Sequence, residues 1–381
     1  EILVAVQASN PGATMYFDLK PKSKKSDLYN FERELLELKE GVEKSRIILL
    51  LGPRRIGKSS VLRTFLNECE SPSILIDTRE MITLEGYINV RSFAILVGNK
   101  IGAFISKNRK RTAKFVEALK RIDGISVSGY SVRISWDKRG KTALPSLLNE
   151  LNNWAEHNNS KVILAFDEAQ ELRDLPFKLV SLFAHIYDYL DNLVIILTGS
   201  QAGLLYDFLK IEDVQSSLYG RALDEIKLRK LEREEAIDFL EKGFKQMKTK
   251  IDKNLIEESV NKLDGIIGWL TYFGWMVTRK KTKSVDKILN EASKLALNEL
   301  EMFLRKSQAE RRYTSILNSL ALRPMKWSEL KRSLEAKEGL EINSSNFTKL
   351  LNRLIKLSII EKKDQLYKII DPVLAYGLAQ L

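Results

Sequence analysis

The chain has 381 residues, with 62 lysines and arginines against 50 aspartates and glutamates, which gives a net charge of +12. This length exceeds what one hydrophobic core usually serves, so the sequence predicts two or three domains. One cysteine, Cys69, and two histidines argue against a disulfide framework and a cysteine or histidine metal centre, and no apolar run is long enough to span a membrane. We therefore expect a cytoplasmic protein, with no membrane contact, that has an acidic partner.

The first fourteen residues differ from the rest of the chain. They have no helical period, they contain a turn-like Asn10-Pro11-Gly12 cluster, and they lack the basic start and long apolar core of a secretion signal. Glu1 cannot be an initiator residue, whereas Met15 could be the natural start. We treat residues 1–14 as a non-native extension that carries no function.

A phosphate-binding loop follows the first predicted helix, which runs from Asp27, a candidate N-cap, to Gly41. The apolar strand 47–51 meets a G-x-x-x-x-G-K-[ST] pattern, and a helical pattern begins at once. Backbone N–H groups of such a loop surround phosphate oxygens, and the positive end of the next helix adds to their field. Lys58 would reach the terminal phosphates, and Ser59 would bind Mg²⁺. The pattern can occur by chance, but its strand–loop–helix context predicts a nucleotide site formed by Gly52, Pro53, Arg54, Arg55, Ile56, Gly57, Lys58, Ser59 and Ser60.

The segment after this loop mixes helices with a hairpin. Residues 73–76, followed by Asp77, predict a short buried strand, and residues 90 to about 121 predict one long helical stretch. The end of that stretch, residues 107–121, carries seven basic residues against one acidic residue. Alternation over residues 124–136, around Ser128-Gly129, predicts a β-hairpin, and a helix is expected over residues 144–157.

Residues 161–168, KVILAFDE, are the second chemical landmark. An apolar run that ends in two carboxylates is typical of a buried parallel strand whose C-terminal end enters an active site. Asp167 would hold Mg²⁺, and Glu168 would orient and deprotonate the attacking water. The alternative is a buried strand that ends in a solvated acidic turn, but the phosphate loop upstream favours the catalytic interpretation.

Two further positions are candidates for catalysis. Residues 192–200 predict a third buried strand that ends in hydroxyls, so Thr198 or Ser200 is either a sensor of the γ-phosphate or a strand-end cap. Arg221, beside Gly220 and just before a short strand at 225–228, could act as an arginine finger supplied to a neighbouring subunit. The alternative for Arg221 is an ordinary solvated arginine.

The chain from Glu232 onward is predicted to be helical and then to form a winged helix. Helices are expected at 232–244, 254–263, 269–278 and 285 to about 306. Three more helices, at 313–322, 327–336 and 345–357, precede two short strands at 359–360 and 367–370, which is the order of a winged helix–turn–helix. Residues 305–370 carry 15 basic and 7 acidic residues, which is +8 of the total +12.

The third helix of a DNA-binding winged helix enters the major groove, and the wing touches the backbone. In this interpretation Ser345, Asn346, Lys349, Asn352 and Arg353 would face DNA, while Phe347, Leu350, Leu351 and Leu354 would pack inward. Lys362 and Lys363 lie in the wing, where they could neutralise phosphates. We therefore assign Lys349, Arg353, Lys362 and Lys363 as candidate nucleic-acid contacts.

An ordered set of segments carries a family resemblance: MYFDLKPKS (15–23), FERELLEL (31–38), GPRRIGKSS (52–60), LIDTRE (75–80), LAFDEAQEL (164–172), LTGSQAG (197–203), LYGRA (218–222) and YKIIDPVLAYG (367–377). In this combination the chain from Met15 onward resembles the archaeal ATPase family, in the STAND branch of the AAA+ P-loop ATPases and related to origin-recognition ATPases. The resemblance implies an α/β fold with a parallel sheet, in which the Thr198 strand lies between the loop strand and the Asp167 strand, a helical lid and a C-terminal winged helix. It places Phe31 and Arg33 near the adenine and matches residues 265–270 to the lid motif, although DGIIGWL departs from the usual glycine pair and proline.

These elements predict a P-loop ATPase domain at 15–230, a lid at 231–306 and a winged-helix domain at 307–381. We expect a switch that binds ATP or ADP with Mg²⁺, hydrolyses ATP slowly and forms a nucleotide-dependent homo-oligomer. Its winged helix would bind double-stranded DNA or a protein, although the winged helices of STAND proteins also act as intramolecular clamps. The alternatives are a nucleotide-gated DNA-binding regulator with little hydrolysis and a P-loop phosphotransferase, which would have little use for a basic winged helix.

Overall fold

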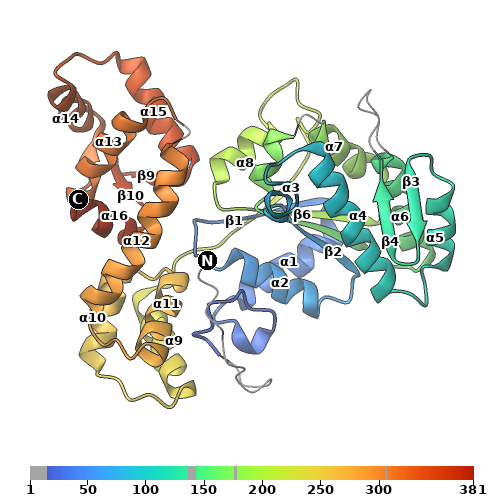
Figure 1. The fold of residues 1–381 in the computed structure, drawn as a ribbon, viewed down its shortest axis with the longest axis horizontal. Coiled ribbons are helices and arrows are strands. Elements are labelled where there is room, and N and C mark those ends of the chain that lie inside the picture. Colours follow the sequence, from blue (N-terminus) through green and yellow to red (C-terminus); the bar gives the residue numbers. More distant parts are fainter. Residues whose placement is uncertain (1–14, 136–142, 176–177, 306) are drawn as a thin grey trace.

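The structure is a computed structural model that describes residues 15–135, 143–175, 178–305 and 307–381. The expected extension 1–14 and Trp136, the last residue of the expected hairpin, lie outside the described residues. Figure 1 shows an α/β part, which contains the large sheet, beside a second part that is mostly helical and ends in the winged helix.

A five-stranded parallel sheet forms the centre of the α/β part. Its strand order is β2-β5-β6-β1-β7, with β1 at Ile47–Leu51, β2 at Ser73–Asp77, β5 at Val162–Asp167, β6 at Leu193–Gly199 and β7 at Asp224–Lys227. The Thr198 strand β6 therefore lies between the phosphate-loop strand and the Asp167 strand, as predicted. Since the carboxyl ends of parallel strands share one edge, the residues that follow β1, β5 and β6 come together there.

Helices cover both faces of this sheet because the buried strands direct alternate side chains to opposite faces. On one face, Ile48 and Leu50 pack with α1 (Glu32–Lys44) and α2 (Lys58–Glu68). On the other, Ile47 and Leu49 pack with α4 (Val90–Lys107), α6 (Leu144–His157), α7 (Leu179–Tyr189) and α8 (Ala202–Leu209).

The first long helix starts later than predicted. Asp27 is not its N-cap but lies in the short 3-10 helix η1 (Lys25–Asp27), and α1 begins at Glu32. Asn30, with a φ of 57°, has a left-handed backbone conformation that interrupts the helical path between them. A second 3-10 helix, η2 (Ala169–Asp174), follows β5.

An insertion between β2 and β5, the insertion lobe, extends to one end of the molecule, where α5 and a hairpin lie (Figure 1). It contains α3 (Glu80–Glu85), α4, α5 (Ala113–Lys120), the hairpin of β3 (Ile125–Ser128) and β4 (Ser131–Ile134), and α6. The hairpin is confirmed, but the single helical stretch predicted from Val90 to about Arg121 is wrong, because the chain leaves the helix after Lys107. There the side chains of Asn108 and Thr112 donate to the carbonyls of Phe104 and Ile105, at 2.9 and 3.4 Å, and compete with helical pairing.

The chain after Leu231 is helical up to the winged helix. Four lid helices appear where the sequence predicts them, α9 (Arg233–Gln246), α10 (Lys253–Leu263), α11 (Ile267–Arg279) and α12 (Val285–Leu304). The predicted winged helix is confirmed as α13 (Glu310–Leu322), α14 (Trp327–Glu338), α15 (Ser344–Lys356), β9 (Ile360–Lys363) and β10 (Leu366–Ile369). Two elements are missing from the prediction, β8 (Met325–Lys326), which pairs with β10, and the last helix α16 (Pro372–Ala379). Across the described ranges, no helix has the length and apolar character needed to cross a membrane.

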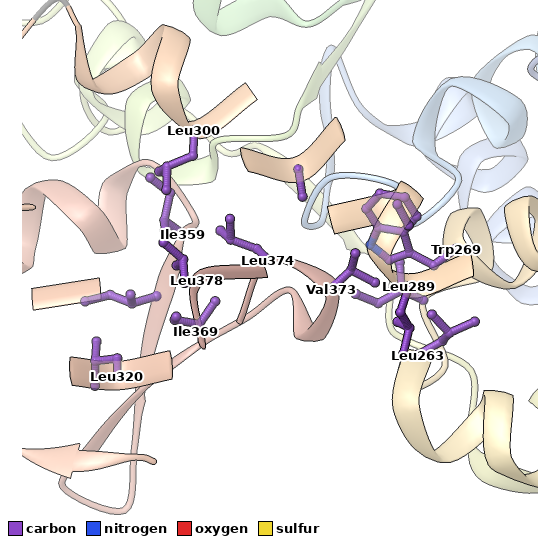
Figure 2. Packing of buried hydrophobic residues seen from close by; sticks show 14 of the residues in the cluster. Leu263, Trp269, Leu289, Leu300, Leu320, Ile359, Ile369, Val373, Leu374 and Leu378 are labelled. Atoms are coloured by element: carbon purple, nitrogen blue, oxygen red, sulfur yellow. The ribbon is translucent and has the colours of Figure 1, made fainter. Parts of the chain in front are cut away.

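One hydrophobic cluster joins the lid helices to the winged helix. Figure 2 shows its centre, where the α16 side chains Val373, Leu374 and Leu378 lie among residues of the lid and of the winged helix, including Leu289 and Ile369. The last helix therefore attaches the winged helix to α12, and a movement of one is expected to move the other.

Candidate nucleotide site

The loop between β1 and α2 has the backbone geometry of a phosphate cradle. Gly52, Arg55 and Gly57 have φ values of 153°, 63° and 101°. Alternation of such conformations with right-handed ones forms anion-binding concavities of N–H groups. Helix α2 begins at Lys58, directly after Gly57, so its N-terminus adds a positive field at the same place.

Lys58 is buried at the centre of this loop. Its Nζ atom donates to the carbonyl oxygens of Gly52 and Pro53, both at 2.7 Å. Burial lowers the pKa of Lys58 to about 8, although the charges of Glu168 and Asp167 act against this shift. A phosphate is a stronger acceptor for an ammonium group than two carbonyls are, so Lys58 is held where it could exchange them for nucleotide oxygens.

Asp167, at the end of β5, is held by hydroxyls from two other elements. The Oγ atom of Ser59 donates to its Oδ2 atom at 2.8 Å, and the Oγ1 atom of Thr198 donates to its Oδ1 atom. Asp167 is 1% exposed. A carboxylate beside a hydroxyl offers the oxygen donors that Mg²⁺ prefers, so Ser59 and Asp167 fit the predicted ion.

Glu168 has a left-handed backbone, with a φ of 56°, and its side chain accepts two hydrogen bonds. Ser200 Oγ and Gln170 Nε2 both donate to its Oε2 atom, at 2.7 and 2.6 Å. Burial would raise the pKa of Glu168, but the charge of Lys58 and these hydrogen bonds lower it below the ordinary value of a glutamate. An ionised Glu168 has the protonation state that a base for water requires. Both candidate sensors contact the acidic residues: Thr198 donates to the Asp167 carboxylate and accepts the backbone N–H of Glu168, and Ser200 donates to the Glu168 carboxylate.

A cavity of about 530 Å³ opens beside these groups and is lined by Lys58, Ser59 and Glu168. The Phe31 ring lies in the same lining against the loop, since a Cβ atom on Gly57 would come within 3.2 Å of it. The lining also includes Tyr16, Lys22, Leu28, Tyr29, Ile267 and Tyr272. A lining that combines apolar and aromatic side chains with cationic groups suits a nucleobase and its phosphates.

The segment from Met15 to Lys22 connects the lid helices to the phosphate loop. Phe17 is buried in the lid core, where a Cβ atom on Gly243 or Gly274 would come within 2.4 Å of its ring. At the other end, the Lys22 backbone N–H donates to the Ser60 Oγ atom at 3.0 Å. Burial lowers the pKa of Lys22 to about 8, and its Nζ atom donates to backbone carbonyls of the same segment.

The side chains of Arg54 and Arg55 are engaged by α12. Arg54 Nη1 and Arg55 Nη1 both donate to the Oε2 atom of Glu299, at 2.9 and 3.0 Å, and Arg55 Nη2 donates to the Oε1 atom. The Arg55 guanidinium also lies 4.1 Å from the centre of the Trp269 ring. Both arginines line the nucleotide cavity, but their charged ends bind a lid carboxylate.

The predicted lid motif, residues 265–270, contacts the same loop. The Gly268 N–H donates to the Arg55 carbonyl at 2.8 Å, and a Cβ atom on Gly268 would lie 2.7 Å from that oxygen. Trp269 Nε1 donates to Asp371, which precedes α16, at 2.9 Å. Burial raises the pKa of Asp371, although Arg55, 4.0 Å away, acts against the shift. The phosphate loop, the lid motif and the start of α16 therefore form one contact network.

Two predicted site residues lie away from the cavity. Arg33 is 65% exposed and its guanidinium pairs with Glu34 and Glu37. Arg221 pairs with Asp188, with 2.9 Å between Nε and Oδ1, and does not line the cavity. Since the predicted finger acts on a neighbouring subunit, the role of Arg221 stays a prediction.

Arg79 is a cavity residue that the sequence reasoning missed. It follows β2, its Nε and Nη2 atoms bind both oxygens of Asp77 at 2.8 and 2.7 Å, and it lines the cavity beside Glu168. Its side chain is 52% exposed. The LIDTRE segment contained the signal that could have predicted this residue: Asp77 and Arg79 form a charged pair at the end of a short buried strand.

The winged helix presents the face that the helical spacing predicts. Phe347, Leu350, Leu351 and Leu354 are buried, whereas Ser345, Asn346, Lys349, Asn352 and Arg353 are exposed. Lys362 and Lys363 are exposed at the end of β9, next to the turn at Asp364 and Gln365, which have φ values of 49° and 65°. A two-residue turn with both φ values positive is typical of a tight hairpin, here the wing.

The C-terminal end of α15 docks on the α/β part. A Cβ atom on Gly203, in α8, would lie 2.5 Å from the Cα atom of Lys356, so only a glycine permits this approach. Lys356 also pairs with Asp207 of α8, with 2.7 Å between Nζ and Oδ1. Since α8 begins two residues after Ser200, the third helix of the winged helix lies against the element that follows β6.

Both parts of the chain resemble known proteins. Residues 28–273 match the family described as an ATPase domain predominantly from Archaea, and residues 307–370 match the MCM protein C-terminal winged helix-turn-helix domain. The Walker-type ATPase PABY2304 of Pyrococcus abyssi is 38% identical over 96% of this chain and 99% of that chain, with a TM-score of 0.80. The ORC2 protein of Aeropyrum pernix, in ADPNP–ADP complexes, is 15% identical over 96% and 95% of the two chains, with a TM-score of 0.60, so this likeness concerns the fold alone. None of the curated proteins compared with the chain matches it.

Proposed function

Because the chain belongs to the family of archaeal P-loop ATPases, enzymes that hydrolyse ATP, we propose that it is a slow molecular switch whose nucleotide state repositions the lid helices and the winged helix. Lys58 would bind the terminal phosphates, Ser59 and Asp167 would hold Mg²⁺, and Glu168 would take a proton from the attacking water. The bound ion would neutralise charge on the phosphate oxygens. The hydrogen bonds that Ser200 and Gln170 donate to Glu168 lower its pKa and so weaken it as a base, which supports slow turnover.

The contact of the phosphate-loop arginines with Glu299 carries the switch proposal. Nucleotide phosphates would compete with this carboxylate for the Arg54 and Arg55 guanidinium groups, because both ligands form charge-assisted hydrogen bonds. Release of Glu299 would free α12, to which α16 attaches the winged helix. A change at the phosphates would thereby become a change in the position of the winged helix. Such a switch is what a place in the STAND branch implies. The parts that move would be the proposed domains, the ATPase domain at 15–230, the lid at 231–306 and the winged-helix domain at 307–381.

Double-stranded DNA is the proposed partner of the winged helix. Lys349, Arg353, Lys362 and Lys363 are exposed together with the polar residues of the same helix face, which supports a backbone contact of low sequence preference. The docking of Lys356 on α8 supports the clamp interpretation for the other end of the same helix. We propose that the two uses coexist, with docking at one end and DNA binding on the exposed face.

The test compares wild type with Glu168→Gln in three nucleotide states, without nucleotide, with ADP and with ATP, and each state is measured with and without mixed-sequence duplex. Light scattering gives the mass, small-angle scattering the radius of gyration, and fluorescence anisotropy the DNA affinity. We expect ATP-bound Glu168→Gln, which cannot reset by hydrolysis, to differ from the ADP state in radius and in DNA affinity, and to reveal any nucleotide-dependent homo-oligomer.

Identical radius, mass and DNA affinity in all states, with hydrolysis intact, would contradict the switch and leave a simple ATPase. A nucleotide-dependent DNA affinity in a wild-type protein that does not turn over would favour the nucleotide-gated regulator instead. A phosphotransferase would show ATP consumption only with a small-molecule acceptor, and its rate would not respond to changes in the winged helix.

A further inference from the structure

A basic hollow lies in the insertion lobe, at the end of the molecule opposite the winged helix (Figure 1). It encloses about 660 Å³ between the end of α4, helix α5 and the β3–β4 turn. Its lining includes Arg109, Lys114, Glu117, Arg121 and Tyr130. The nucleotide site and the proposed DNA face of the winged helix use none of these residues.

The three cations of the hollow are available to a ligand. Arg109, Lys114 and Arg121 are exposed, and within the described ranges none of them has an acidic partner at ion-pair distance. Glu117, the acid in the lining, is already paired with Lys120 at 2.8 Å. Lys114 and Arg121 lie seven residues apart, two turns of α5, and therefore on one face of the helix. Lys107, Lys110 and Arg111, in the same segment of the chain as Arg109, are also exposed and add to the positive charge of the lobe.

Tyr130 is an exposed aromatic residue on a firmly held turn. The residue as a whole is 52% exposed, although its backbone carbonyl lies against α4. A Cβ atom on Gly102 would lie 2.1 Å from the Tyr130 carbonyl oxygen, and one on Gly98 would lie 2.4 Å from the Val132 carbonyl oxygen. Glycine within a helix costs roughly 1 kcal/mol relative to alanine. The two glycines of α4 thus permit the hairpin to lie directly on the helix, which fixes the backbone of Tyr130 at the rim of the hollow.

We propose that this basic hollow is a binding surface for single-stranded nucleic acid. The arginines and lysine would contact successive phosphates, and the exposed Tyr130 ring, on its fixed backbone, would offer a platform on which an unpaired base stacks. Positive grooves interleaved with aromatic side chains are the usual composition of single-strand sites, and an aromatic platform contributes little to a duplex whose bases are already stacked. An acidic protein segment would use the same charges but would gain nothing specific from the ring.

The test measures binding of a fluorescein-labelled 20-nucleotide oligo(dT) and of a 20-base-pair duplex to the full chain by anisotropy. The background variant carries Lys349→Glu, Arg353→Glu, Lys362→Glu and Lys363→Glu, so that the winged helix does not contribute. To this background we add either Arg109→Glu, Lys114→Glu and Arg121→Glu together, or Tyr130→Ala alone. The matched control adds Lys39→Glu, Lys245→Glu and Lys250→Glu, three exposed lysines outside the lobe that change the net charge equally. Circular dichroism and ATP hydrolysis confirm that each variant is folded.

The background protein is expected to bind oligo(dT) more tightly than the duplex. The triple hollow variant should lose at least about tenfold in oligo(dT) affinity relative to the matched control, and its dependence of log K on log salt should flatten by about 2, since three phosphate contacts contribute roughly 0.7 each. Tyr130→Ala should weaken oligo(dT) binding at least about fivefold and leave duplex binding unchanged.

Equal oligo(dT) affinity in the hollow variant and the matched control overturns the proposal. So does a variant that keeps oligo(dT) binding but loses binding of labelled poly-glutamate, which would assign the hollow to an acidic protein partner. If Tyr130→Ala leaves the oligo(dT) affinity unchanged, Tyr130 is not a stacking platform, and the hollow binds oligo(dT) through unspecific charge alone. None of these results depends on ATP hydrolysis, so they are independent of the proposed switch.

Discussion

The Nη2 atom of Arg79 lies 3.5 Å from the Oδ2 atom of Asp167, and the same guanidinium is held by Asp77. A cation of the same chain therefore lies beside the phosphate loop and the acids Asp167 and Glu168. It belongs to the segment just after β2, the strand that pairs with β5. Its hydrogen bond to Asp77 raises the pKa of Arg79, so its charge is permanent. A preorganised cation at this place can stabilise charge that develops on phosphate oxygens.

We expect Arg79→Ala to lower kcat for ATP hydrolysis by about a hundredfold and to change nucleotide affinity much less, because stabilisation of developing charge acts mainly in the transition state. Arg79→Lys should restore part of the rate. The measurement is single-turnover hydrolysis over a range of protein concentrations, with nucleotide affinity by titration calorimetry. Arg221→Ala is the comparison, since its effect should appear only where subunits associate. If kcat is unchanged in Arg79→Ala, or if its loss depends on protein concentration, Arg79 does not stabilise the transition state within its own subunit.

A second prediction separates binding from hydrolysis. Lys58→Ala should lose most nucleotide affinity because it removes a ground-state phosphate contact. Glu168→Gln should keep the affinity and lose turnover, because the amide cannot accept a proton from water. Titration calorimetry and phosphate release measure the two quantities. Wild-type affinity in Lys58→Ala would contradict the first half, and normal turnover in Glu168→Gln the second.

The affinity for ATP should fall as the pH rises through about 8. The pKa of Lys58 in the free protein is about 8, whereas a bound phosphate favours the charged form and raises it. If only the charged form binds, affinity drops about tenfold between about pH 7 and about pH 9. Lys22 has a similar pKa in the same cavity, so Lys22→Met is needed to isolate the contribution of Lys58. A flat profile in Lys22→Met would show that the charge of Lys58 does not control binding in this range.

The sequence predicts those parts of the site whose local structure is determined by residues that are neighbours in the chain. The loop backbone, Lys58 and Ser59 are determined by one strand–loop–helix unit, and Asp167 and Glu168 follow one apolar run. The family resemblance then placed β6 between their strands. The sequence also predicts which side chains of α15 are buried and which are exposed, because the amphipathic period of a single helix determines this.

The remaining features depend on contacts between residues far apart in the chain. Arg54 and Arg55 belong to the predicted loop, yet their side chains bind Glu299, 244 residues away from Arg55. Asp371 joins Trp269 across 102 residues, and no local pattern indicates either partner. The break between α4 and α5 contains neither proline nor glycine, so only the local hydrogen bonds of Asn108 and Thr112 reveal it.

The winged helix provides a fourth prediction. Reversal of Lys349, Arg353, Lys362 and Lys363 to glutamate should weaken duplex binding on any sequence and flatten its salt dependence by roughly 0.9 for each phosphate that the protein no longer neutralises. Reversal of Lys39, Lys245, Lys250 and Lys253, which are exposed outside the winged helix, is the control for net charge. A folded variant with the affinity and salt slope of this control would favour the clamp as the function of the winged helix.

The last prediction concerns Gly203, where α8 meets α15. In an isolated helix, Gly203→Ala would stabilise by about 1 kcal/mol. Here the added Cβ atom would lie 2.5 Å from the Lys356 Cα atom, so α15 has to move away. We therefore expect Gly203→Ala to leave ATP affinity unchanged and to abolish the nucleotide dependence of DNA affinity. Because the contact between α8 and α15 opens, limited proteolysis should cut the chain more readily at these two helices.

Lys356→Ala is the matched control for this prediction, because it removes the ion pair to Asp207 without adding an atom at the contact. An exposed ion pair contributes about 1 kcal/mol or less, so this variant should keep most of the coupling. If Gly203→Ala shows the same response of DNA affinity to ATP as wild type, then α8 does not transmit the nucleotide state. The coupling would then run through the contacts of Arg54 and Arg55 with Glu299 alone. Glu299→Gln, which weakens both arginine contacts while keeping the side-chain shape, should abolish the coupling in the Gly203→Ala background.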